Sequence, residues 1–219
     1  MSHGTLAVFQ HHPAEGVGRI GLWAQHHNIK LVCFYAPDDL PKSLVDYDGL
    51  IVLGGPMNVA DNPAWMQTEV KLIQQALTLR RPILAICLGA QLLATQLGGQ
   101  VIEMPAPELG WQDIRFNDAS VLTVPQWHEQ AIALPQHIAV LAASAQCPVQ
   151  MYRHQQAIGL QFHPEWDNEQ IAQLREYFAD ECPFSNDLQP NTLHNEQQTQ
   201  LEQFLFTLLE QQFKLDEPC

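Results

Sequence analysis

One cysteine stands at a point in the chain where its thiol could act as a nucleophile. Cys87 directly follows the apolar run 82–86, and residues 88–93 continue with helical spacing. This order predicts a buried strand, a sharp turn that carries the cysteine, and a helix that begins at once. Unpaired N–H groups and the helix dipole there favour a thiolate and can stabilise a developing oxyanion. The alternative is that Cys87 is a small buried hydrophobic residue without chemistry.

Two other groups of residues that could take part in chemistry also follow apolar runs. Gly54, Gly55 and a proline follow one run, and His163 and Glu165, separated by a proline, follow another. An imidazole can take a proton from a thiol and return it to a leaving group, while a carboxylate beside it fixes its tautomer. Glycine leaves a backbone N–H accessible to an oxyanion. Each group alone is more typical of a turn, so the functional interpretation depends on their occurring together.

The spacing of apolar residues predicts the elements that must position these groups. The expected strands cover residues 5–9, 30–35, 49–53 and 82–86, and the expected helices cover 19–27, 64–79 and the segment after Cys87. Continuous apolar strands that alternate with helices are typical of a parallel sheet covered on both faces. Such a sheet binds ligands at the carboxyl ends of its strands. The three groups are therefore expected at one edge.

The second half of the chain has a different texture. Short segments of alternating polarity at 111–116 and 120–124 predict antiparallel strands, and further strands are expected at 101–103, 138–142 and 157–162. Helices are expected at 168–178 and 195–213, with a polar loop over 182–192. Leu201, Phe204, Leu205 and Leu208 have helical spacing, which indicates a packing helix or, alternatively, a helix that binds a partner.

Composition narrows the classes of partner. The 219 residues include 10 Lys plus Arg against 24 Asp plus Glu, a net charge of −14. Such a surface repels phosphate backbones and anionic membranes, so neither nucleic acid nor membrane is an expected partner. No segment has the length of a membrane span or the pattern of a secretory signal, and the five scattered cysteines have no metal or redox spacing. These features favour reduced thiols and a cytoplasmic location.

Two adjacent histidine pairs, at 11–12 and 26–27, could suggest a metal site. Neighbouring residues on a helix or strand do not face the same site, so these side chains are expected at the solvated surface. No metal and no other cofactor is expected.

Three blocks of sequence carry a resemblance to a known family. They are Leu-Gly-Gly-Pro-Met at 53–57, Ile-Cys-Leu-Gly-Ala-Gln-Leu-Leu-Ala at 86–94, and Gln-Phe-His-Pro-Glu at 161–165. The chain resembles the class I, triad-type glutamine amidotransferases and is most similar to the glutaminase domain of GMP synthase. The resemblance covers residues 5–178 and implies a single domain over 1–219. The implied fold is a three-layer, flavodoxin-like α/β fold: an open, mostly parallel sheet with helices on both faces and a small antiparallel extension.

The resemblance implies a role for each matching residue. Cys87 would attack the side-chain amide of glutamine, and the N–H groups of Leu88 and Gly55 would hold the tetrahedral oxyanion. His163, oriented by Glu165, would protonate the departing ammonia. Water would then hydrolyse the γ-glutamyl thioester to glutamate.

Substrate binding is implied at three further positions. Gln91 matches a family position that helps bind glutamine, and Trp127 and His128 fall where relatives have a loop that meets the α-carboxylate and amino group. The alternative for Trp127 and His128 is a loop packed on the sheet. One residue departs from the family pattern: Ala85 occupies a position where most relatives have glycine, and its methyl group could crowd the turn at Cys87.

Four accounts of function are open from the sequence. The chain lacks the Ser-Gly-Gly-Xaa-Asp-Ser phosphate loop of the ATP-pyrophosphatase domain in full GMP synthases. It is therefore expected either to deliver ammonia to a separate synthase subunit or to hydrolyse a γ-glutamyl small molecule alone. A non-enzymatic ligand sensor on the same fold is a third account, and a DJ-1/PfpI-like protein, which typically has His directly after the cysteine, is a remote fourth. The sequence indicates neither the acceptor nor the oligomeric state.

Overall fold

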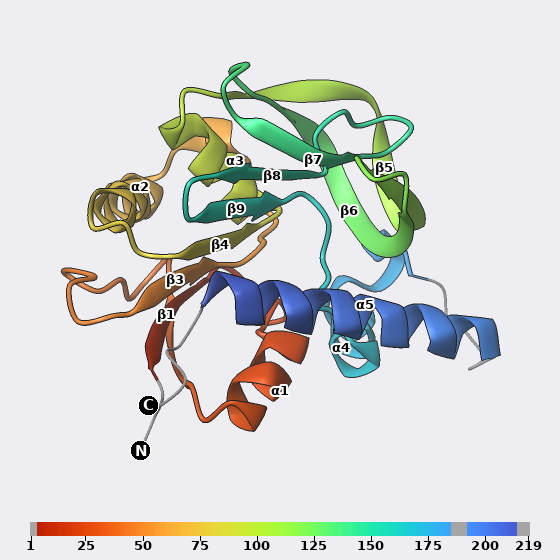
Figure 1. The fold of residues 1–219 in the computed structure, drawn as a ribbon, viewed down its shortest axis with the longest axis horizontal. Helices are drawn as coiled ribbons and strands as arrows, with labels where there is room; N and C mark the ends of the chain where they lie inside the picture. Colours follow the sequence, from red (N-terminus) through yellow and green to blue (C-terminus); the bar gives the residue numbers. More distant parts are fainter. Residues whose placement is uncertain (1–3, 185–191, 214–219) are drawn as a thin grey trace.

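One nine-stranded sheet organises the part of the chain that the computed structural model describes, residues 4–184 and 192–213 (Figure 1). The strand order is β2-β1-β3-β4-β9-β8-β7-β5-β6. The strands are β1 (Thr5–Gln10), β2 (Lys30–Tyr35), β3 (Gly49–Val52), β4 (Ile83–Ile86), β5 (Gln100–Phe116), β6 (Val121–Ala133), β7 (Ala139–Ala143), β8 (Met151–His154) and β9 (Ala157–Leu160).

The first five strands in that order pair in parallel, as the apolar runs predict. β3 and β4 are buried at every residue, which explains why their sequences are continuously apolar. β9 is the junction of the sheet, because it pairs in parallel with β4 and antiparallel with β8. The carboxyl ends of β3, β4 and β9 therefore lie side by side.

The strands of the antiparallel half are longer than the sequence pattern predicts. The segments predicted separately at 101–103 and 111–116 belong to one 17-residue strand, β5, which pairs with the 13-residue β6 around an irregularity between Glu103 and Glu108. Two prolines and a glycine inside this stretch hide it from a propensity argument. The sequence pattern does not predict β8, and residues 161–162 lie beyond the end of β9.

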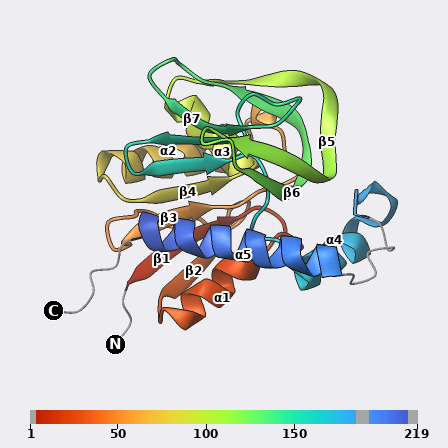
Figure 2. The same ribbon diagram turned by 45° about the vertical axis from the view of Figure 1, so that its right-hand side comes forward.

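Helices cover both faces of the sheet (Figures 1 and 2). α2 (Ala64–Thr78) and α3 (Leu88–Gln96) pack in one buried cluster with Ala7, Leu50 and Ala85, whereas α1 (Gly18–His26) and α5 (Thr192–Gln212) pack in another with Leu6, Ile51 and Leu84. Successive strand residues thus face opposite layers. α4 (Asn168–Phe178) begins shortly after the His163 segment, with Asp167 as its N-cap.

The last helix confirms the packing interpretation. Leu201, Leu205, Leu208 and Leu209 are buried, and α5 lies along α1 and contacts β6. The loop predicted over 182–192 falls mostly outside the described residues. Within the described residues, no helix combines the length and apolar character that crossing a membrane requires.

Candidate active site

The Cys87 turn is a strained connection between β4 and α3. Cys87 has φ 48° and ψ −109°, a backbone conformation that non-glycine residues rarely adopt and that is concentrated at functional sites. The turn is held by the Cys87 N–H, which donates to the Leu160 carbonyl at 2.7 Å, and by the Gln91 N–H, which donates to the Cys87 carbonyl at 2.9 Å. The strain therefore presents the thiol at the N-terminus of α3.

Gly89 lets the helix start this close to the sheet. A Cβ atom at Gly89 would lie 2.4 Å from the Val52 carbonyl oxygen of β3, closer than real side chains come to a backbone atom. Ala85, two residues before Cys87, is fully buried in β4 and packs in the same cluster as Leu88 and Tyr152. β4 keeps its parallel register through this residue, with Ala85 opposite Gly159.

The segment after β9 brings a buried imidazole and carboxylate together. Nδ1 of His163 lies 2.8 Å from Oε1 of Glu165, and both side chains are 2% exposed. The His163 ring stacks on Trp166 with centroids 3.5 Å apart, and its backbone N–H donates to the Pro125 carbonyl. Burial disfavours the charged ring, but Glu165 and the Cys87 sulfur outweigh it and raise the pKa of His163 to about 10. The ring is therefore an imidazolium at neutral pH.

Several groups converge around the Cys87 sulfur. A methyl group built on Gly54 would lie 2.6 Å from Cε1 of His163 and 3.4 Å from Cβ of Cys87, so the absence of a side chain there lets the two approach. The Gln161 amide donates to the sulfur at 3.7 Å, and the thiol lies 4.0 Å from the Trp127 carbonyl oxygen. The residues predicted as nucleophile and base are thus neighbours at one sheet edge.

The expected oxyanion donors, Leu88 and Gly55, line the same pocket as the sulfur. Leu88 is the first residue of α3, and Gly55 follows β3. Within residues 4–184 and 192–213, neither backbone N–H has a hydrogen-bond partner. A Cβ at Gly55 would lie 3.1 Å from Cδ2 of Leu88. Two free N–H groups beside the thiol can stabilise negative charge on a bound carbonyl oxygen.

His11 corrects the expectation that both histidine pairs are solvated. Its side chain is fully buried at the end of β1, with Nδ1 2.9 Å from the Gly54 carbonyl oxygen and Nε2 2.9 Å from Oε1 of Glu69. Burial opposes the charge, but Glu69 and the Gly54 carbonyl outweigh it and raise the pKa of His11. A charged ring donates both of its N–H groups, so His11 holds the segment that carries Gly55.

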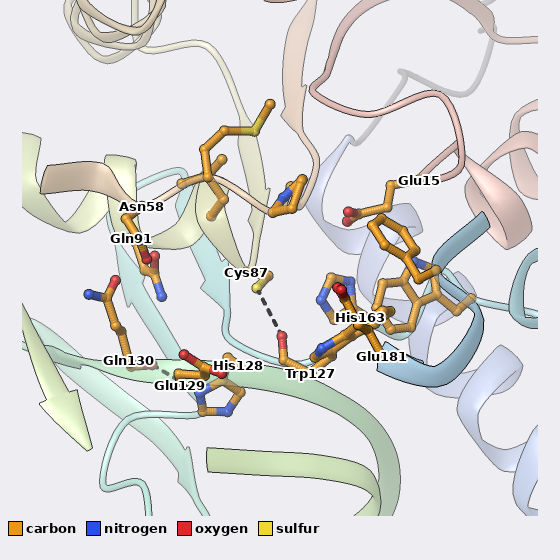
Figure 3. Close-up of a pocket in the computed structure, with 16 residues that line it drawn as sticks. Glu15, Asn58, Cys87, Gln91, Trp127, His128, Glu129, Gln130, His163 and Glu181 are labelled. Carbon is orange, nitrogen blue, oxygen red and sulfur yellow. Dashed lines mark hydrogen bonds between the residues drawn. The ribbon is translucent and has the colours of Figure 1, made fainter. Parts of the chain in front are cut away.

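A pocket of about 280 Å³ opens around Cys87 (Figure 3). It is lined by Glu15, Gly55, Pro56, Met57, Asn58, Cys87, Leu88, Gln91, Trp127, His128, Glu129, Gln130, His163, Trp166, Phe178 and Glu181. All residues predicted from the sequence to bind substrate are in this set. Gln91 lies at the opposite side of Cys87 from Glu15 in Figure 3.

Trp127 and His128 lie on a strand rather than a loop, because β6 runs from Val121 to Ala133. Both nitrogens of the His128 ring face groups of the protein rather than the pocket. Nε2 lies 3.0 Å from Oε2 of Glu108, and Nδ1 lies 2.9 Å from the Gln130 carbonyl oxygen. Burial opposes ionisation of Glu108, but the His128 ring beside it and hydrogen bonds from Ser144 and Gln150 keep its pKa low. What this stretch offers a ligand is therefore mainly backbone.

Glu15 is the pocket residue that sequence reasoning missed. It precedes α1, is 7% exposed, and points its carboxylate into the pocket from the His163 side (Figure 3). Burial raises the pKa of Glu15 to about 7, although His163 and His11 pull it down. Its position three residues before α1, shortly after the end of β1, is a signal that could have placed it at the active edge.

Among the residues described, no three His, Cys, Asp or Glu side chains are arranged to hold a metal ion.

Comparison with known proteins identifies the family to which the chain belongs. A model of the family "Glutamine amidotransferase class-I" matches residues 22–178. The chain is 32% identical over 190 residues to the glutamine amidotransferase-like protein YfeJ of Salmonella typhimurium, a match that covers 78% of this chain and 80% of that protein. It is 34% identical over 140 residues to one of the subunits of the glutamine-hydrolysing GMP synthase of Sulfurisphaera tokodaii, a match that covers 59% of this chain and 73% of the relative.

A solved structure extends the agreement to the fold. A glutamine amidotransferase from Thermotoga maritima superposes with a TM-score of 0.86 at 26% identity, covering 97% of this chain and 99% of the other. Both the predicted fold class and the family resemblance are confirmed. The chain belongs to the class I glutamine amidotransferase family.

Proposed function

We propose that this protein hydrolyses a γ-glutamyl amide, with glutamine as the simplest substrate, through a thioester on Cys87. The observation that carries the proposal is the strained Cys87 at the N-terminus of α3, facing a buried His163–Glu165 pair with an N–O distance of 2.8 Å. A cysteine sulfur, an imidazole that holds its proton and two free backbone N–H groups are the parts that acyl transfer from an amide requires. Membership of the family is consistent with hydrolysis of the glutamine amide.

The steps follow from these groups. His163 holds the proton of the Cys87 thiol, so the deprotonated sulfur attacks the amide carbon, and the N–H groups of Leu88 and Gly55 stabilise the oxyanion. When the C–N bond breaks, His163 gives its proton to the leaving nitrogen, so ammonia departs rather than an amide anion. His163 then takes a proton from water, which attacks the thioester and releases glutamate and the free thiol. Glu165 holds the ring and stabilises its charge throughout.

Substrate recognition is proposed at the other side of the sulfur. The Gln91 side chain and the backbone at Trp127 and His128 are polar groups that fit the α-amino and α-carboxylate groups of the γ-glutamyl unit. The burial of the His128 ring supports a role for the backbone rather than the imidazole.

Glutamate release from glutamine tests the proposal, with Cys87→Ala as the inactive variant and Cys33→Ala as the matched control. Cys33 is an exposed thiol on β2, remote from the pocket, so its removal should leave the rate unchanged. Equal background release by the wild type and Cys87→Ala, on glutamine and on a panel of γ-glutamyl amides, would contradict catalysis and favour a ligand sensor.

Delivery of ammonia to a separate synthase is a second proposal, supported by the names of relatives. The Sulfurisphaera tokodaii relative is named as one of the subunits of a GMP synthase, so by its name it is part of a larger enzyme. If this chain works in the same way, its glutaminase rate should rise when the synthase partner is added. A rate that is already maximal without any partner would favour a hydrolase that acts alone.

A further inference from the structure

The pocket around Cys87 has two chemically different sides. Polar side chains of Asn58, Gln91 and Gln130 lie on one side of the sulfur in Figure 3, and Glu15, His163 and Glu181 lie on the other. If the γ-glutamyl unit occupies the Gln91 side, the leaving nitrogen must face His163, which protonates it. The side with Glu15 and Glu181 is therefore the leaving-group side.

Glu15 is a buried carboxylate without a partner on that side. It is 7% exposed, its side chain points into the pocket, and no hydrogen bond to the carboxylate is found among the described residues. A methyl group on Gly54 would lie 3.0 Å from Oε2 of Glu15 and 2.6 Å from Cε1 of His163, which puts the carboxylate beside the base. A buried acceptor with no internal donor fits a donor that comes from the ligand.

The charges of the lining reinforce this assignment. The leaving-group side carries two carboxylates, Glu15 and Glu181, whereas Glu129 lies on the Gln130 side in Figure 3, and the described lining residues include no lysine or arginine. Aromatic rings stand beside them: Trp127 packs on Phe178 with centroids 5.1 Å apart. Carboxylates and aromatic faces both attract ammonium groups, whereas a leaving group with its own carboxylate would face Glu15 and Glu181, with only the His163 ring, whose proton goes to the leaving nitrogen, to offset them. The net charge of −14 adds a long-range attraction for cations.

We propose that Glu15 and Glu181 form a leaving-group subsite that selects γ-glutamyl amides of amines with a second positive charge, such as diamines. The subsite rests on the proposed function, because it assumes the same attack by Cys87. Glu15 accepts a hydrogen bond from the departing nitrogen, and the exposed Glu181 at the rim binds the distal ammonium. The reaction balances as amide plus water giving glutamate plus the diamine, with the His163 proton going to the nitrogen released from the carbonyl.

Three amides of matched length test the subsite: the γ-glutamyl N-(4-aminobutyl), N-butyl and N-(3-carboxypropyl) amides, which carry a positive, a neutral and a negative leaving group. At low salt, kcat/KM should fall in that order, with the cationic amide preferred over the neutral one by about fivefold or more. The ratio should fall in Glu15→Gln and in Glu181→Gln. Glu176→Gln, an equal charge change on α4 outside the pocket, should leave the ratio as in the wild type.

Calorimetric titration of the three amides into Cys87→Ala measures the same preference without turnover. A neutral amide that is bound and cleaved as well as the cationic one, or a preference that survives in both Glu15→Gln and Glu181→Gln, would overturn the subsite. Glutamine hydrolysis is measured in parallel: a Cys87-dependent rate with no charge preference refutes the subsite alone, whereas no Cys87-dependent rate on any substrate refutes the proposed function. In that second case the titration still decides the subsite.

Discussion

Breaking the buried pair of His11 and Glu69 should cost more than either residue's contacts suggest. Both side chains are fully buried, and the charged His11 ring donates to Oε1 of Glu69 and to the Gly54 carbonyl, each at 2.9 Å. His11→Leu removes both donors and leaves a carboxylate without its partner in the interior. Glu69→Leu leaves an imidazolium in the same position. Each single variant therefore leaves one buried charge without its partner, which lowers the free energy of unfolding.

The magnitude follows from that isolation. Removal of one partner of a buried ion pair typically lowers the free energy of unfolding by about 3–5 kcal/mol. The double variant, His11→Leu with Glu69→Leu, removes both charges and loses chiefly the donor to Gly54, worth about 1–2 kcal/mol. The two single variants together should lower the free energy of unfolding by about 6–10 kcal/mol, so the double variant should be more stable than their sum predicts by at least about 4 kcal/mol.

Urea denaturation followed by circular dichroism provides the measurement, with His27 and Glu210 as the matched control. That pair has the same residue types at 3.5 Å, but its side chains are 41% and 55% exposed, so its coupling should lie within about 1 kcal/mol of zero. Additive effects at His11 and Glu69 would refute the reasoning. Because His11 also holds the Gly55 segment, the double variant should regain stability without regaining glutaminase activity.

Three further outcomes are expected. Gly54→Ala should lower kcat/KM by about 100-fold, because the new methyl group would lie 2.6 Å from Cε1 of His163 and must displace it, whereas Gly21→Ala, whose methyl meets only the Val17 side chain, should not. Glu165→Gln should lower the pKa of His163 from about 10, so that its Cε1–H resonance titrates nearer neutral pH. The pKa of Glu15 is raised from 4.5 to about 7, so the free energy of unfolding of the wild type should fall as the pH rises through this range. Glu15→Gln removes this ionisation. In urea denaturation, the free energy of unfolding of Glu15→Gln relative to the wild type should therefore be higher at pH 8 than at pH 5, by on the order of 2–3 kcal/mol.

The parallel half of the fold and the three strand ends were predictable because their signals are local. An apolar run that stops at a cysteine and resumes with helical spacing describes β4, the turn and α3 completely. The same holds for His163 and Glu165, where two residues separated by a proline need only one strand end to meet. The irregular β5 was less predictable, since its prolines and Gly110 interrupt the strand pattern in the sequence. The strand is continuous in the structure because it pairs with β6.

The local sequence pattern did not predict which polar residues are buried. His11 appears in sequence as one of two adjacent histidines, and only the position of Glu69 on α2 determines that one of them is an interior ion. Glu15 appears as one acidic residue among 24 Asp and Glu. In both cases groups from segments far away in sequence surround the side chain, Glu69 around His11 and His163 near Glu15, so the environment exists only after the layers have assembled.

The position of β9 has a consequence for the order in which the protein acquires its chemistry. β4, which leads to Cys87, is completed by β9, as Ile83 pairs with Ala157 and Ile86 with Leu160. Contacts between segments so distant in sequence form late, and during synthesis the base follows the nucleophile out of the ribosome by many residues. A nascent chain that has emerged only as far as β8 carries an ordinary thiol without imidazole, carboxylate or completed turn. Cys87 therefore becomes reactive only when β9 has paired with β4 and His163 lies beside the thiol.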